Sequence, residues 1–181
     1  RVVAALMGVA ASGGYYVALP ADAIVAHPTT VTGYIGVIFI KPKVAGLMEK
    51  MGLDVEVEKS GVNKAMGSPF RKSTDEERQI AQTLIDGLAG RFLRLVETHR
   101  SLAPAGLESV ASARVYLADE ALRMGLVDQI GYLDDAIDRL KRLAELPEDA
   151  RVVVYRRTEY SDDNVYNSGS ALSEGGSLKL V

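Results

Sequence analysis

Ser12 is the residue whose surroundings most suggest chemistry. It lies in the run Ala10-Ala11-Ser12-Gly13-Gly14, between an apolar stretch and the start of a predicted short helix. A hydroxyl at such a turn projects outward, and the positive end of the helix favours negative charge beside it. The backbone N–H of Gly13 can then donate to the oxyanion that forms when a carbonyl is attacked. The same residues also suit an ordinary helix start, with Ser12 as N-cap and the glycines allowing tight packing.

The base that would activate Ser12 is not obvious, and a serine is a weak nucleophile without one. His27 follows a predicted strand in a turn, and His99 ends a long predicted helix, where a cation suits the helix dipole. We expect neither histidine to be catalytic. Lysine is the other candidate, since serine–lysine dyads carry out the same chemistry. The chain has eight lysines, and counting them does not choose one.

The composition excludes several other kinds of site. The chain has 181 residues, no cysteine and a net charge of −3. Without cysteine there is no thiolate metal site, disulfide or cysteine nucleophile, and we expect no cofactor and no metal. A slightly acidic chain without a basic stripe does not favour nucleic acid as a partner. The length suits one globular domain.

The elements that position Ser12 are expected to alternate between strands and helices. Apolar runs predict strands buried on both faces, as in a parallel sheet covered by helices. The predicted fold class is therefore α/β, with a mostly parallel sheet and flanking helices. We expect strands at residues 2–7, 23–26, 37–40, 55–58, 126–130 and 152–155, and helices at 44–51, 75–98, 107–113, 120–124 and 133–146.

The longest predicted helix begins at about Asp75, after an N-cap in the run 73–77 that also supplies first-turn carboxylates. Its apolar residues recur at helical spacing, so they face either the core of the same chain or another copy. The stripe consists of Ile80, Leu84, Leu88, Phe92, Leu95 and Val96.

Two segments are set apart by composition. Residues 2–19 carry no charge, but their glycines and alanines favour a buried strand and a turn over a membrane span. From residue 158 the chain is rich in Ser, Gly, Asn and Asp, which predicts a flexible tail over 158–181 after a domain at 1–157. The chain opens on a core strand at Arg1 rather than on Met, so we expect a missing upstream segment.

Linked motifs along residues 1–145 resemble the signal peptide peptidase A family, serine peptidase family S49, in its short single-domain form. The resemblance implies a ClpP/crotonase-like layered fold. The matching motifs keep the order and spacing of the family. They are MGVAASGGYY (7–16), AD (21–22), TVTGYIGVI (30–38), KSGVNK (59–64), MGSPFR (66–71), TDEE (74–77) and GLVDQIG (125–131).

The resemblance implies a role for each matching residue. Ser12 is the nucleophile and Lys64 the general base, 52 positions later and in the same chain. Gly13 supplies an oxyanion donor, and Ser60 holds the lysine ammonium. Lys59 is the competing base, but it follows Glu58 at the end of a predicted strand, where a solvated charge is expected.

Two positions and one region depart from the family. Tyr34 stands where a small hydroxyl residue is common, so its O–H would orient the lysine with a different geometry. Ala65 replaces a frequent acidic residue. The strand–helix units that precede the nucleophile, with the loop giving the second oxyanion donor, are absent from this chain. Part of the site is therefore expected to come from an upstream segment or another chain.

The implied activity is that of a serine endopeptidase cleaving hydrophobic peptides, such as remnant signal peptides, in or near a membrane. The implied partners are other copies in a ring or dome. The implied location is membrane-associated through the missing upstream segment, with an extracytoplasmic catalytic domain. Two alternatives stay open, a crotonase-type acyl-CoA enzyme and a non-catalytic peptide-binding or assembly domain of the same fold.

Overall fold

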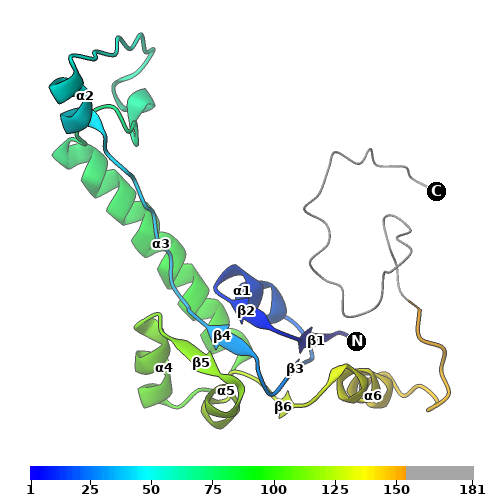
Figure 1. Ribbon diagram of the computed structural model, residues 1–181. Coiled ribbons are helices and arrows are strands. Elements are labelled where there is room, and N and C mark those ends of the chain that lie inside the picture. Colours follow the sequence, from blue (N-terminus) through cyan, green and yellow to red (C-terminus); the bar gives the residue numbers. More distant parts are fainter. Residues whose placement is uncertain (154–181) are drawn as a thin grey trace.

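The computed structural model describes residues 1–153. They form two small sheets packed with short helices, which together we call the base of the molecule, and a long helix that projects from it (Figure 1). The predicted end of the domain at 157 and the predicted tail at 158–181 lie outside the described residues. So does half of the strand expected at 152–155, and residues 152–153 have no regular structure. The predicted α/β class, with mostly parallel strand pairing and flanking helices, is confirmed.

The first sheet contains three parallel strands in the order β1-β3-β6. They are β1 (Val3–Leu6), β3 (Ala23–Ala26) and β6 (Gln129–Ile130). All four residues of β3, the central strand, are buried, as an uninterrupted apolar run predicts. The sequence predicted all three strands.

The second sheet holds the residues around Ser12 and was not predicted. It joins β2 (Val9–Ala11) in parallel to β4 (Val31–Gly33), which pairs antiparallel with β5 (Val115–Leu117). Each strand has only three residues, too few to show a period of two in the sequence. β2 lies where we had expected a turn.

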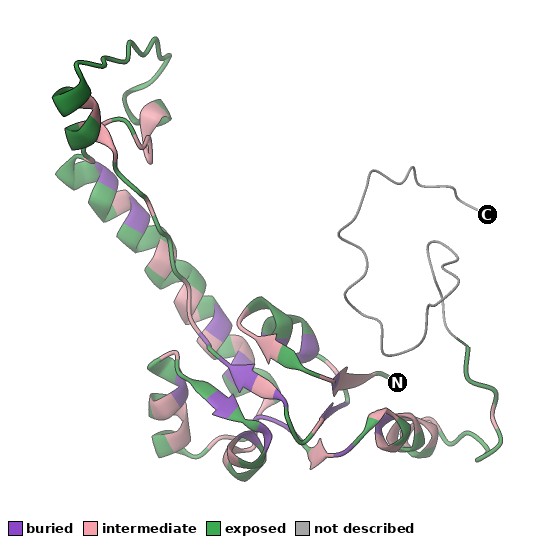
Figure 2. Ribbon diagram, viewed as in Figure 1, coloured by how far each residue is buried: buried purple, intermediate pink, exposed green. Residues whose placement is uncertain are grey.

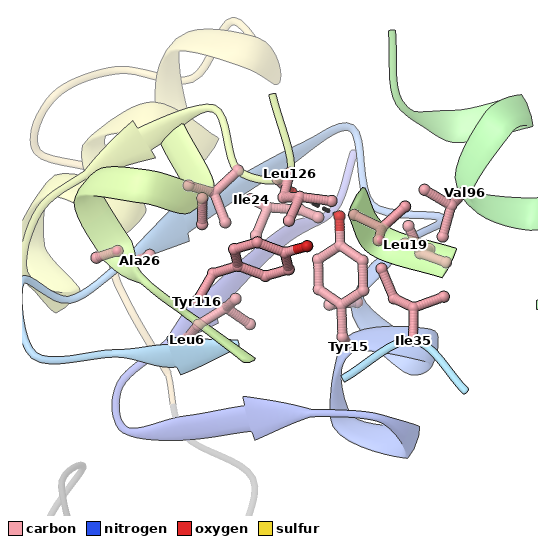
Figure 3. Close-up of a cluster of buried hydrophobic side chains, with 14 of the residues drawn as sticks. Leu6, Tyr15, Leu19, Ile24, Ala26, Ile35, Val96, Tyr116 and Leu126 are labelled. Atoms are coloured by element: carbon pink, nitrogen blue, oxygen red, sulfur yellow. Dashed lines mark hydrogen bonds between the residues drawn. The ribbon is translucent and has the colours of Figure 1, made fainter. Parts of the chain in front are cut away.

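The core lies between the first sheet and the helices α1 (Gly13–Ala18), α4 (Pro104–Ala111) and α5 (Ala118–Met124), with α6 (Leu133–Leu143) beside β1. Figure 3 shows the two largest buried side chains, Tyr15 and Tyr116, among aliphatic residues from several elements. Tyr15 comes from α1, so the helix that follows Ser12 is packed into the core on one side.

The long helix α3 (Asp75–His99) matches its predicted limits. Its first turn has a capping box, in which Thr74 and Glu77 each bond to the other's backbone N–H. Only its C-terminal half reaches the base, where Phe92 and Val96 are buried. The predicted apolar stripe faces the core only in part, since Leu84 is 56% and Leu88 54% exposed.

Residues 37–74, which we call the arm, lead along α3 to its N-terminal end (Figure 1). The arm contains α2 (Ala45–Met51), which ends at the left-handed C-cap Gly52, and the 3-10 turn η1 (Val62–Ala65). Most of its residues are exposed (Figure 2). The strands predicted at 37–40 and 55–58 are wrong, because these residues pair with no other strand in the described part of the chain.

Residues 2–19 form β1, β2 and α1, in keeping with the rejection of a membrane span there. None of the helices within residues 1–153 combines the length and the apolar character that crossing a membrane requires.

Candidate active site

Ser12 lies at a strained turn between β2 and α1. Its backbone has φ 51° and ψ −116°, a conformation that non-glycine residues rarely adopt. Its side chain makes no capping hydrogen bond to α1, so the plain N-cap interpretation is wrong. Strain of this kind persists only where surrounding contacts impose it, and it concentrates at functional sites.

Two backbone hydrogen bonds impose this conformation. The Ser12 N–H donates to the Gly33 carbonyl oxygen over 2.8 Å, and the Ser12 carbonyl accepts from the Tyr16 N–H over 2.8 Å. Gly33 ends β4 with φ +83°, and a Cβ there would lie 2.5 Å from Cδ2 of Tyr116. The turn is therefore fixed by β4 and by the core tyrosine behind it.

Helix α1 is anchored to the core below the turn. The Tyr15 hydroxyl donates to the Leu126 carbonyl over 2.7 Å, and burial raises the pKa of this phenol well above its usual range (Figure 3). Nearby, Asp128 accepts from the Ile24 N–H and from two nitrogens of Arg100. Burial opposes ionisation of Asp128, yet the Arg100 and Ile24 hydrogen bonds keep its pKa below the usual range.

Ser12 borders two hollows on the surface. One, of about 480 Å³, is lined by Ser12, Tyr34, Gly36, Val37, Ile38 and Ala113. The other, of about 240 Å³, is mostly apolar and adds residues of α1 and α3. Its lining consists of Ser12, Gly13, Tyr16, Gly36, Val37, Leu88, Arg91 and Phe92. Two adjoining hollows at one hydroxyl can hold an extended chain on both sides of a reacting carbonyl.

The structure brings three of the predicted site residues together. Gly13 begins α1, so its N–H has no acceptor within the helix, and Gly13 lines the smaller hollow beside Ser12. Tyr34 lies across the larger hollow from Ser12, in a left-handed conformation with φ 54°. Ser12, Gly13 and Tyr34 are therefore gathered around adjoining hollows.

Lys64 and Ser60 are not near Ser12 in the same copy. Lys64 is in η1, where the neighbouring Asn63 donates to Glu76 on the first turn of α3 over 3.2 Å. Ser12 instead lies beside Arg91 on the same helix. The axial distance from Glu76 to Arg91 is about 22 Å at about 1.5 Å per residue. The sequence-based expectation that one copy brings serine and lysine together is not met in this structure.

The other candidate bases are also placed away from Ser12. Lys59 is on the arm, where it donates to the Val62 carbonyl over 2.9 Å. His27 bonds to Thr29 and meets the ring of Tyr132 edge-on, and His99 ends α3. Neither histidine lines a hollow that Ser12 borders.

Sequence reasoning missed the contribution of α3 to this site. Leu88 and Phe92 were predicted as part of the apolar stripe of this helix, and Arg91 was not considered. The i, i+4 spacing of Leu88 and Phe92 was visible, but spacing cannot distinguish a core face from the wall of a hollow. Within residues 1–153, no three acidic or histidine side chains are grouped to hold a metal ion.

Comparison with known families decides the affiliation of this chain. The family model described as peptidase family S49 matches residues 1–147. The chain belongs to peptidase family S49. It is 39% identical over 155 residues to the Enterococcus faecium protein named "Putative signal peptide peptidase SppA", covering 86% of this chain and 45% of that protein. It is 31% identical over 173 residues to "Protease 4" of Haemophilus influenzae, covering 96% of this chain and 28% of the relative.

The S49 chain thus spans about half or less of the length of these relatives. Among solved structures, it resembles an enoyl-CoA hydratase/carnithine racemase from Magnetospirillum magneticum, with 14% identity and a TM-score of 0.40. That match covers 79% of this chain and 36% of the other. Values this low do not support a shared function, and the crotonase-type alternative gains nothing from them.

Proposed function

We propose that this S49 chain provides a serine–lysine peptidase site that cleaves apolar peptides, with Ser12 as nucleophile. The observation that carries the proposal is the strained turn at Ser12, a residue whose side chain makes no capping bond and which lines both hollows. A serine held in this way is exposed to an incoming carbonyl without any rearrangement of the backbone.

The proposed reaction is acyl transfer in two stages. The Ser12 hydroxyl attacks the peptide carbonyl carbon while neutral Lys64 accepts its proton, and the Gly13 N–H donates to the oxyanion. The protonated lysine then gives its proton to the leaving amine as the C–N bond breaks. The lysine then takes a proton from a water molecule, whose oxygen attacks the acyl carbon, and returns that proton to the Ser12 oxygen as the ester C–O bond breaks.

We propose that Lys64 reaches Ser12 from a neighbouring copy. Within one copy the two residues lie at opposite ends of α3, and Lys64 is exposed. The arm that carries it displays apolar side chains that the rest of residues 1–153 leaves exposed, among them Ile38, Phe39 and Ile40. Exposed apolar surface of this extent is typical of protein interfaces. A covering copy would also remove water from the lysine, which favours its neutral form.

The substrate class follows from the smaller hollow. Its walls are mostly side chains of Tyr16, Val37, Leu88 and Phe92, which suit an apolar substrate residue beside the cleaved bond. This preference, and the signal peptide peptidase name of the Enterococcus faecium relative, support remnant signal peptides as substrates. We propose action in or near a membrane for the same reason.

Complementation between two inactive variants tests the proposal. Ser12→Ala and Lys64→Ala should each abolish hydrolysis of an apolar peptide while leaving the thermal unfolding temperature nearly unchanged. When the two are co-expressed and assemble at random in equal amounts, about a quarter of the sites combine an intact serine from one copy with an intact lysine from the next. Activity near a quarter of wild type is therefore expected.

Other outcomes are equally informative. No activity in the mixture would refute a site shared between copies, since every chain lacks one of its two groups. Full activity of Lys64→Ala would refute the dyad itself. A fluorophosphonate probe should label Ser12 in wild type and not in Ser12→Ala. Failure to label the wild type would favour a binding or assembly domain, or an acyl-CoA enzyme.

A further inference from the structure

Glu77 is a carboxylate with little solvent contact at the start of α3, only 2% exposed. Both of its oxygens accept from Arg71, one over 3.0 Å, and one also accepts from the Thr74 N–H over 3.1 Å. Chiefly because of the Arg71 hydrogen bonds, the pKa of Glu77 is lowered to about 2. Glu77 is therefore ionised at any pH where a peptidase works, and it fixes the guanidinium of Arg71.

Arg71 links this anchor to the turn that carries Lys64. One terminal nitrogen donates to the Ala65 carbonyl over 3.0 Å, and the other to the Lys72 carbonyl over 3.1 Å. Ala65 is the last residue of η1 and directly follows Lys64. A planar guanidinium can hold a carboxylate and a carbonyl in one fixed geometry, whereas a lysine ammonium is a flexible point charge.

The turn depends on such contacts because it is short. η1 has four residues, and its N-cap Gly61 provides no side-chain hydrogen bond. On the other side of Lys64, Asn63 donates to Glu76 over 3.2 Å. Residues 63 and 65 are thus both tied to the start of α3, and the residue between them is Lys64. Isolated 3-10 turns of this length have little stability of their own.

We propose that Arg71, anchored by Glu77, is a positioning residue for Lys64. This inference rests on the proposed function, in which Lys64 is the general base. A misplacement of about 1 Å is enough to lower the rate of a positioned reaction by about a hundredfold. The charged groups around the turn are Lys59, Arg71, Glu76 and Glu77, with Lys43 facing Glu77 from the arm.

The decisive variant is Arg71→Lys in the assembled peptidase. It keeps the positive charge beside Glu77 and removes the planar guanidinium that bonds to both Glu77 and the Ala65 carbonyl. We expect kcat to fall at least about tenfold, with KM unchanged, because the amine of Lys64 is no longer held in place for proton transfer. An unchanged KM means that the peptide still binds, so a loss confined to kcat reports on the reacting groups rather than on a general loss of structure.

The matched control is Arg78→Lys. Arg78 pairs with Asp75 and the Ser73 carbonyl on the same first turn of α3 and does not touch η1. Its kcat and KM should match those of wild type. Glu77→Gln is the second test variant, since glutamine retains the capping box but binds Arg71 without charge. It should give the same loss of kcat as Arg71→Lys, and it decides the matter if that variant does not fold.

The result that overturns positioning is a wild-type kcat, or a rise in KM as large as the fall in kcat, in a folded Arg71→Lys or Glu77→Gln protein. Lys64→Ala is measured in the same series because it distinguishes a failure of the positioning role of Arg71 from a failure of the serine–lysine dyad. An inactive Lys64→Ala beside an unaffected Arg71→Lys refutes positioning and leaves the dyad standing. A fully active Lys64→Ala refutes the dyad and, with it, the positioning role.

Discussion

Replacing Gly33 by alanine tests the claim that β4 and Tyr116 fix the turn at Ser12. The added Cβ would lie 2.5 Å from Cδ2 and 3.0 Å from Cε2 of the Tyr116 ring, and 3.1 Å from the Arg114 carbonyl oxygen. Tyr116 is buried and its hydroxyl is hydrogen-bonded to Ser109 over 3.0 Å, so the ring has little room to move. The alanine would also occupy φ +83°.

The expected destabilisation has two parts. The left-handed backbone costs an alanine about 1 kcal/mol, and forcing an atom into a packed core adds about 1–3 kcal/mol. The total of about 2–4 kcal/mol corresponds to a Tm lower by about 4–16 °C for a domain of this size. Gly52→Ala is the matched control, because Gly52 has φ +67° and nothing within 4 Å of the added Cβ.

Thermal unfolding followed by circular dichroism measures both variants. The Tm of Gly52→Ala should fall only by the part due to the left-handed backbone, about 2–4 °C. Gly33→Ala should also lose peptidase activity at temperatures where it is folded, because the Gly33 carbonyl accepts the Ser12 N–H. Equal Tm values for the two variants would refute the steric argument. A fully folded and fully active Gly33→Ala protein would show that β4 does not determine the backbone conformation at Ser12.

Two further predictions concern buried polar groups. Because the pKa of Glu77 is lowered to about 2, its contribution to stability is complete above about pH 4.5 and is lost as the pH falls toward 2. The Tm of wild type should therefore drop over this acid range more steeply than that of Glu77→Gln, and parallel curves would contradict the assignment. Tyr15→Phe leaves the Leu126 carbonyl without its donor and should cost about 1–3 kcal/mol in urea unfolding. A change within error would mean that another group takes the place of the hydroxyl.

The sequence predicted those elements whose signals are local. The apolar run at 23–26 became the central buried strand, and the N-cap at Thr74 begins α3 where expected. The Ser12 turn was also identified, because a serine among tiny residues after a strand is a local pattern. Its backbone strain was not, since φ and ψ at Ser12 depend on hydrogen bonds to Gly33, 21 positions away.

The errors share one physical cause. Residues 37–40 and 55–58 have strand-forming composition, but a strand needs a partner, and no partner is present among residues 1–153. Leu84 and Leu88 have core-like spacing, but nothing in the described chain covers them. Periodicity shows which side of an element is apolar, and it does not show what that side meets. The sequence likewise does not show that Lys64 lies far from Ser12, because that separation depends on what the arm packs against.

The length of α3 also has a kinetic consequence. In one copy, this helix of 25 residues separates the turn that carries Lys64 from the turn that carries Ser12. If the two groups meet only across copies, hydrolysis must rise faster than linearly with enzyme concentration when the enzyme is dilute, and vanish on sufficient dilution. A newly synthesised chain would then cleave none of the proteins around it until it assembles with other copies.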